Sequence, residues 1–314
     1  PIASLVLIRI NGGTAMMRIL GIVGVQVCIC VPIIVFQFCK GKEFFSKEYW
    51  GYALRIGIPI VPHYLSGIIL NQGDRIMIDK MVGKTEVALY GLAYSIGMLV
   101  QLFISGMNSA LTPWMYSKIK KGDIRSMRKV LQLLSIVVVG IAVALMLISP
   151  ELVLIFGSPK YREAVYVIPP VAASVFFIFI YNILSMPQFY YEKTQFLMVA
   201  SMAAAGANVV LNFIFIRLFG YIAAGYTTLA CYMLYSVGHY IVSKRILVNE
   251  GIQENLMSPG FLVACSVFLI GASIICNLIF PYRILRYAIL LASAGLVFWK
   301  KELLLKTMAD IRKK

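Results

Sequence analysis

Apolar runs of about 20 residues recur along this chain, and they constrain its fold more than any other feature. A helix of that length crosses the hydrocarbon core of a bilayer. The 314-residue sequence is 61% hydrophobic and 13% charged, whereas soluble domains carry about 25% charged residues. The runs are continuous rather than alternating, and backbone groups must be satisfied within lipid, so helices are favoured over a barrel. The sequence therefore predicts an all-α integral membrane protein, a polytopic helix bundle.

Windows of about 20 residues predict a series of membrane spans after a short apolar opening segment. The nine predicted spans cover residues 19–39, 52–77, 87–111, 130–148, 165–190, 195–216, 221–242, 260–280 and 284–299. When residues 40–47 are placed inside, the inner loops and the C-terminal tail carry more Lys and Arg than the outer loops. This excess predicts a cytoplasmic C-terminus.

Charge, cysteine content and missing motifs narrow the function classes. The net charge of +16 is typical of basic loops that set membrane orientation, so no nucleic-acid partner is expected. The six cysteines, at positions 28, 30, 39, 231, 265 and 276, lie in apolar segments without zinc or CxxC spacing. No phosphate-binding loop, HExxH or GxSxG motif occurs, and the chain has two histidines. We therefore expect no enzyme activity, metal or cofactor.

Polar and charged residues interrupt the second predicted span at residues 63–75, HYLSGIILNQGDR. A charge at the bilayer centre costs about 2.5–3.5 kcal/mol, so such residues usually face a cavity or a partner. His63, Asn71 and Asp74 fall within a sector of about 80° on one side of a helix, and Arg75 lies beyond its edge. The pattern favours a functional role for Asp74 and Arg75.

A structural interpretation of the same segment remains open. Asp74 lies about 27 Å along the helix from residue 56, close to the outer edge of the hydrocarbon. Arg75 could therefore belong to an outer ion pair, with Asp79 one turn further on. His63, without a second ligand, is interpreted as a cavity or core histidine. Arg55, near the inner end, adds an intramembrane or interfacial cation.

Later spans carry polar stripes of their own. In the third span, Gln101 and Asn108 share a face with Tyr94, which indicates either interhelical hydrogen bonding or cavity lining. In the fifth span, Asn182 lies in a stripe that ends near Pro187, which is expected to break the helix. The sixth span combines Ser201, Asn208 and Asn212 with the small residues 203–207, and we interpret this face as a packing seam.

Several motifs resemble those of bacterial polysaccharide-biosynthesis flippases. One is NQGDRIMI at residues 71–78, followed by VALYGLAY at residues 87–94. Others are NVVLNF at 208–213, GYIAAG at 220–225 and YYEKT at 190–194. These flippases export O-antigen and capsule repeat units and are part of the multidrug/oligosaccharidyl-lipid/polysaccharide (MATE-like) superfamily. The resemblance extends over nearly the whole chain.

The resemblance implies a domain plan of two six-helix lobes and two extra C-terminal helices. On that plan residues 1–48 form the end of the first lobe and a cytoplasmic linker. Residues 49–245 form a complete second lobe, and residues 246–314 form the two C-terminal helices and a basic cytoplasmic tail. Most of the first lobe is then expected to be missing from this chain.

The activity that the resemblance implies is translocation of undecaprenyl-pyrophosphate-linked oligosaccharide across the bacterial cytoplasmic (inner) membrane, by ion-coupled alternating access. Cations compensate a desolvated pyrophosphate, and amides replace the hydration of sugars. The candidate cavity-lining residues are Arg55, His63, Asn71, Gln72, Asp74, Arg75, Gln101, Asn108 and Asn182, with Asp74 as the candidate for ion coupling. The implied partners are the lipid-linked oligosaccharide, membrane lipids, and the polymerase and chain-length regulator proteins of polysaccharide synthesis.

Three alternatives remain open. The nearest is another transporter of the superfamily, either a cation-coupled drug exporter, which would need an acidic and aromatic cavity, or a peptidoglycan-precursor flippase. A non-transporting scaffold of a polysaccharide assembly complex would have its polar stripes filled by interhelical contacts. A membrane glycosyltransferase would need a carboxylate-bearing surface loop, and Glu151 and Glu163 are the acids near one such outer loop.

Overall fold

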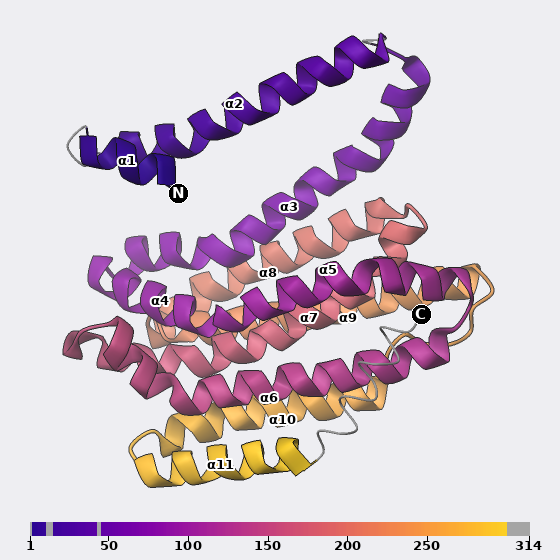
Figure 1. Ribbon diagram of the computed structural model, residues 1–314. Coiled ribbons are helices and arrows are strands. Elements are labelled where there is room, and N and C mark those ends of the chain that lie inside the picture. The colour runs from indigo at the N-terminus through magenta and orange to yellow at the C-terminus, as the bar shows by residue number, and fades with distance from the viewer. Residues whose placement is uncertain (1, 11–14, 43–44, 300–314) are drawn as a thin grey trace. The chain divides into compact units, whose positions relative to one another are not determined.

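The computed structural model describes residues 2–10, 15–42 and 45–299, and these residues form helices and no strands (Figure 1). The elements are α1 (Ile2–Ile10), α2 (Ala15–Gly41), α3 (Lys47–Met81), α4 (Lys84–Gly97), α5 (Leu99–Lys120), α6 (Ile124–Phe156), the 3₁₀ helix η1 (Pro159–Val167), α7 (Ile168–Tyr190), α8 (Thr194–Phe219), α9 (Ala223–Asn249), α10 (Pro259–Ile279) and α11 (Arg283–Trp299). The predicted all-α polytopic membrane protein is confirmed. The predicted basic tail, residues 300–314, lies outside the described residues.

Within the described residues, 7 helical segments are long and apolar enough to cross a membrane. They are Met16–Gly41, Lys47–Met81, Lys84–Lys120, Ile124–Phe156, Pro159–Tyr190, Thr194–Phe219 and Pro259–Ile279. They coincide with the first six predicted spans and the eighth. The seventh predicted span is α9, which is less apolar because Thr, Tyr, Ser and His occupy much of it. The ninth is α11, which is shorter, with 17 residues.

Two local predictions differ from the structure. The third predicted span is interrupted at Met98, between α4 and α5. Here a Cβ on Gly97 would lie 2.7 Å from Val171 Cγ1, so the glycine permits a close approach to α7. The predicted break at Pro187 is wrong, because α7 continues to Tyr190. Pro187 lies in the last turn, where its carbonyl still accepts a hydrogen bond from the Tyr191 N–H at 3.0 Å.

The chain divides into two compact units, Pro1–Arg55 and Ile56–Lys314. In the first unit α1 packs against α2, and almost every described side chain of α2 is exposed. The division falls inside α3, which continues without interruption through Pro59 and Pro62. The lobe boundaries expected after residues 48 and 245 stay a prediction.

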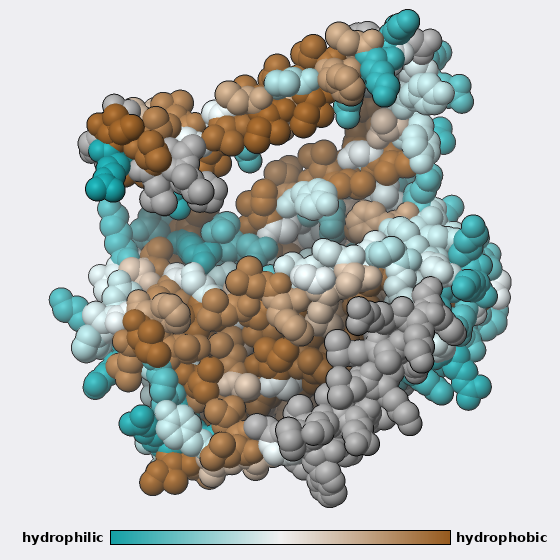
Figure 2. All heavy atoms as spheres, viewed as in Figure 1, coloured by the Kyte–Doolittle hydropathy of each residue, from teal (hydrophilic) through white to brown (hydrophobic). Residues whose placement is uncertain are grey.

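In the second unit α7 forms the centre of the helix bundle. It packs against α9, α6, α5 and α10, and its Phe176 and Phe179 are fully buried. The helices α10 and α11 lie along α6, on the side away from α8 (Figure 1). On the face of this unit drawn in Figure 2, hydrophobic residues form a broad band between hydrophilic residues at the helix ends. This distribution suits a bundle surrounded by lipid.

Candidate functional site: a buried carboxylate and an aromatic cavity

Asp74 of α3 is fully buried and receives hydrogen bonds from three other helices. Tyr90 Oη of α4 donates to Asp74 Oδ2 at 2.6 Å, and Thr228 Oγ1 of α9 donates to the same oxygen at 2.7 Å. Asn212 Nδ2 of α8 donates to Asp74 Oδ1 at 2.5 Å. All three donors are neutral, and Asp74 has no ion-pair partner among the described residues. Dipoles alone therefore compensate the buried carboxylate, which is an uncommon arrangement for a charge within a membrane protein.

Asn212 extends this network to a second asparagine and a second threonine. Its Nδ2 also lies 3.2 Å from Asn208 Oδ1, and its Oδ1 accepts a hydrogen bond from Thr227. Asn208 and Asn212 are fully buried between α8 and α9, as a packing seam requires. Asn212 also donates from its amide nitrogen to Asp74, so the seam is at the same time part of the polar site.

Arg75 points to a different set of groups. Its Nη1 donates to the Asn71 carbonyl oxygen at 2.7 Å and to Gln72 Oε1 at 2.8 Å. Its guanidinium lies 4.6 Å from the centre of the Tyr94 ring, at the distance of a cation–π contact. The alternative ion pair between Arg75 and Asp79 does not occur. Arg75 therefore keeps its charge beside neutral groups.

A cavity of about 190 Å³ lies between α3, α7 and α9 of the second unit. Its lining is aromatic and polar, and comprises His63, Tyr64, Gly67, Leu70, Asn71, Tyr181, Asn182, Ser185, Phe189, Tyr232 and Tyr235. His63 Nδ1 lies 3.0 Å from Tyr235 Oη, and Tyr94 Oη donates to Asn71 Oδ1 at 2.8 Å. Phenol, imidazole and amide groups therefore converge on one space, and His63, Asn71 and Asn182 are the predicted lining residues found there.

Six predicted lining residues do not line the cavity: Asp74 and Arg75, described above, and four that lie elsewhere. Arg55 is exposed and belongs to the first unit, and Gln72 is exposed beside Arg75. Gln101 and Asn108 of α5 are partly buried and do not line the cavity.

Sequence reasoning missed several groups around Asp74. Tyr90 lay inside a motif that carried the family resemblance, but its hydroxyl had no assigned role. The adjacent Thr227 and Thr228 were not singled out, since threonine is common in helix seams. The spacing of Asn208 and Asn212, four residues apart on one face, was the signal that could have placed them in the site.

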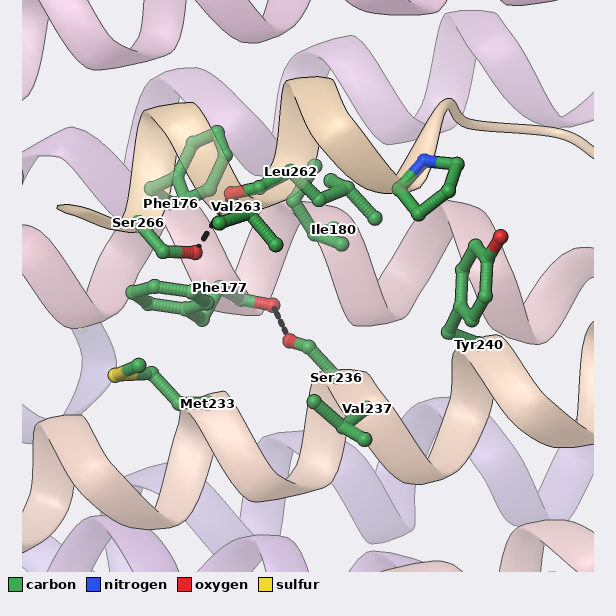
Figure 3. A pocket seen from close by; sticks show the side chains of 11 residues that line it. Phe176, Phe177, Ile180, Met233, Ser236, Val237, Tyr240, Leu262, Val263 and Ser266 are labelled. Carbon is green, nitrogen blue, oxygen red and sulfur yellow. Dashed lines mark hydrogen bonds between the residues drawn. The ribbon is translucent and has the colours of Figure 1, made fainter. Parts of the chain in front are cut away.

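A second pocket lies between α7, α9 and α10 and has a different character (Figure 3). Phe176, Ile180, Val237 and Leu262 make it apolar. Its two serine hydroxyl groups are occupied, since Ser236 Oγ donates to the Phe177 carbonyl oxygen and Ser266 Oγ to that of Leu262, as Figure 3 shows. The Tyr240 hydroxyl is its other polar side-chain group, so the pocket offers little for a sugar or a pyrophosphate to bind.

Comparison with known proteins agrees with the motifs. Residues 2–120 match the model of the family described as "Polysaccharide biosynthesis protein". The chain is 29% identical over 165 residues to "Lsg locus putative protein 1" of Haemophilus influenzae, an alignment that covers 49% of this chain and 40% of the relative. It is also 29% identical over 191 residues to an "Uncharacterized membrane protein" of the same organism, covering 57% of this chain and 46% of the relative.

The chain thus spans less than half the length of the curated relatives it matches. No solved structure matches it. The family match covers α1 to α5, which include the segment with Asp74, Arg75 and Tyr90. The predicted resemblance is therefore confirmed, with a family match over residues 2–120 rather than nearly the whole chain: the chain is a multi-pass helical membrane protein similar to the polysaccharide biosynthesis protein family.

Proposed function

We propose that this chain is part of a flippase, and not an enzyme, that moves undecaprenyl-pyrophosphate-linked oligosaccharide across the bacterial inner membrane by ion-coupled alternating access. The observation that carries the proposal is the aromatic, amide-lined cavity beside a buried carboxylate that no cation neutralises. The C-terminus is cytoplasmic in this proposal, and the polymerase and chain-length regulator proteins are its neighbours in polysaccharide assembly.

The cavity lining suits a carbohydrate. Tyrosine rings such as Tyr181 and Tyr235 present flat apolar faces for sugar C–H groups, while Asn71 and Asn182 offer both donors and acceptors for hydroxyl groups. Arg75, hydrogen-bonded to the backbone of Asn71, provides a cation close to this lining, and guanidinium binds phosphate oxygens in a bidentate manner. The matched relatives are more than twice as long as the aligned parts, so the cavity is one portion of the proposed path.

The same lining argues against the nearest alternative. Among the described residues, no carboxylate lines the cavity, whereas a cation-coupled drug exporter would need an acidic one. A pure scaffold is disfavoured because His63 and Asn71, although each bonds to a neighbouring helix, also line an open space. Glu151, a candidate acid for a glycosyltransferase, is hydrogen-bonded by Arg286 inside the bundle.

Asp74 suits ion coupling because it connects α3 to the rest of the second unit. The extensive helix contacts of this unit do not involve α3, yet the Asp74 side chain joins it to α4, α8 and α9. Binding of a proton or a monovalent cation changes which of these hydrogen bonds the carboxylate accepts. Whether an ion is bound at Asp74 would thereby change how strongly α3 is held to α4, α8 and α9. Coupling between an ion and a conformational change requires such a dependence.

A translocation assay on the full-length protein tests the proposal. Asp74→Asn and Arg75→Ala are each expected to lower oligosaccharide translocation by about tenfold or more, a barrier change of about 1.4 kcal/mol. Asp79→Asn is the matched control, because Asp79 lies on the same helix and is exposed. If both site variants translocate normally at normal expression, the site assignment is wrong. Imposing proton and sodium gradients separately identifies the coupling ion.

A further inference from the structure

Three fully buried polar side chains on α7 and α9 have atoms without hydrogen-bond partners. Gln188, His239 and Ser243 are 0%, 0% and 1% exposed. Gln188 Nε2 lies 2.8 Å from His239 Nδ1, but Gln188 Oε1, His239 Nε2 and Ser243 Oγ have no protein partner. Ser243 lies one helical turn beyond His239 on α9. No other cluster among the described residues joins three such side chains on two packed helices.

The missing partners do not depend on how the amide and the ring are oriented. With Gln188 Nε2 donating to Nδ1, the neutral imidazole carries its proton on Nε2, and Gln188 Oε1 faces no donor. Turning the amide over and moving the ring proton to Nδ1 leaves Gln188 Nε2 unpaired in place of Oε1, and His239 Nε2 still has no partner. Buried polar groups nearly always have partners, and internal water commonly supplies them. Internal water would supply the missing partners of this cluster.

The cluster continues a polar face that runs along α9. Thr228, Tyr232, Tyr235, His239 and Ser243 fall within a sector of about 80°. Thr228 donates to Asp74, Tyr235 lies beside His63, and the rings of Tyr235 and His239 are 4.5 Å apart. Exposed apolar residues such as Leu234, Val237 and Ile241 occupy the other side of the helix.

We propose that Gln188, His239 and Ser243 hold internal water and form the inner half of a proton path along α9, between Asp74 and the predicted cytoplasmic side. The inference rests on the proposed ion coupling at Asp74 and makes the proton the coupling ion. The cavity between α3, α7 and α9 forms the middle of the path, because Tyr181 and Tyr235 line it and both contact the His239 ring.

The chemistry of one transfer balances on the imidazole ring. An N–H bond forms at Nδ1 with a proton taken from a hydronium ion while the Gln188 amide is turned away from the ring, and the N–H bond at Nε2 breaks to return a proton to water. The ring is neutral at the end and has changed tautomer. Gln188 is suited to this exchange because its amide donates to Nδ1 in one tautomer and accepts from it in the other. The titratable groups that face His239 are Tyr181, Tyr235 and His63.

Water at the cluster can be measured without any substrate. The full-length protein, labelled with ¹⁵N-histidine and reconstituted in bilayers, is studied by water-edited solid-state NMR. The His239 signal is assigned by its loss in His239→Phe, which keeps a ring between Tyr181 and Tyr235. We expect polarisation transfer from water to the His239 ring nitrogens. Absence of that transfer would overturn the proposal.

Proton flux tests the path itself. Proteoliposomes with internal pyranine and clamped potential receive an acid pulse in the presence of extracted undecaprenyl-pyrophosphate oligosaccharide. His239→Phe is expected to lower proton flux by about 100-fold and Ser243→Ala by about tenfold, since positioned groups accelerate proton transfer to that extent. Ser236→Ala is the matched control, because that buried hydroxyl already donates to the carbonyl oxygens of Phe177 and Tyr232.

The outcomes separate this inference from the proposed function. Loss of flux in His239→Phe with oligosaccharide binding retained supports the path. Normal flux in His239→Phe and Ser243→Ala, with flux lost in Asp74→Asn, overturns the path and leaves coupling at Asp74 intact. Normal flux in Asp74→Asn contradicts the proposed coupling, whatever the histidine variants do. His239→Gln repeats the test if the phenylalanine variant does not fold.

Discussion

The second unit holds two carboxylates inside its helices in opposite ways. Glu151 of α6 receives two hydrogen bonds of 2.8 Å from Arg286 of α11, which is 3% exposed and also donates to the Leu147 carbonyl oxygen. Asp74 of α3 receives hydrogen bonds from Tyr90, Thr228 and Asn212 and from no cation.

The difference separates a static charge from an exchangeable one. The bidentate guanidinium of Arg286 neutralises the charge of Glu151, so this pair attaches α11 to α6. The carboxylate then has no uncompensated charge with which to bind an ion. The charge of Asp74 is compensated only by neutral dipoles, so binding of a proton or a monovalent cation can still neutralise it. The first arrangement is a structural ion pair, and the second is the arrangement on which the proposed ion coupling rests.

The strongest test of the comparison removes the cation from the first pair. Arg286→Ala leaves Glu151 without its partner and is expected to destabilise the protein by about 3 kcal/mol, at the low end for a broken buried pair because Glu151 is partly exposed. Thermal unfolding of the purified full-length protein in detergent measures the change. The double variant Arg286→Met, Glu151→Leu should recover most of the loss. A double variant no more stable than Arg286→Ala would contradict a clamp between α6 and α11.

The corresponding change at Asp74 separates charge from hydrogen bonding. Asp74→Leu leaves three buried donors unpaired, so we expect a loss of about 2 kcal/mol in the free energy of unfolding. Asp74→Asn keeps the shape and an acceptor, so its loss should be about 1 kcal/mol or less while translocation falls. Chemical denaturation of both variants measures the two losses. Equal destabilisation by leucine and asparagine would show that the hydrogen bonds to Asp74 do not hold α3.

The two asparagines of α8 sharpen the account of the Asp74 network. Asn212 bonds to Asp74, Asn208 and Thr227, whereas Asn208 Nδ2 has no partner. Asn212→Ala should therefore cost about 1–2 kcal/mol of stability and Asn208→Ala less, because fewer buried partners lose a hydrogen bond. Unfolding midpoints of the two variants provide the comparison. The reverse order would place the centre of the network at Asn208.

The smallest effect is expected at a carboxylate on the surface of the same helix. Asp79 is exposed, so Asp79→Asn should change the free energy of unfolding by less than about 0.5 kcal/mol. The same denaturation experiment serves for this variant. A larger change would reveal a role for Asp79 that its surroundings in the structure do not explain.

The fold class and most span positions followed from the sequence because they depend on local composition. A run of apolar residues long enough to cross the bilayer can be recognised from the sequence whatever other helices it packs against. The interruption at Met98 and the continuation of α7 through Pro187 did not follow. Both depend on what surrounds the backbone: the close approach of Gly97 to Val171 in one case, and the position of Pro187 within the last turn in the other.

For the site, the sequence by itself determined that Asp74 and Arg75 lie in a membrane span and that His63, Asn71 and Asp74 share one side of their helix. Helical periodicity is enough for that conclusion, because it relates residues a few positions apart. Only the tertiary structure decided that Asn212 and Thr228, 138 and 154 residues further along the chain, bond to Asp74, and that Arg75 stacks on Tyr94 rather than pairing with Asp79. Contacts between distant segments depend on how helices pack, and side-chain periodicity within one helix carries no information about its neighbours.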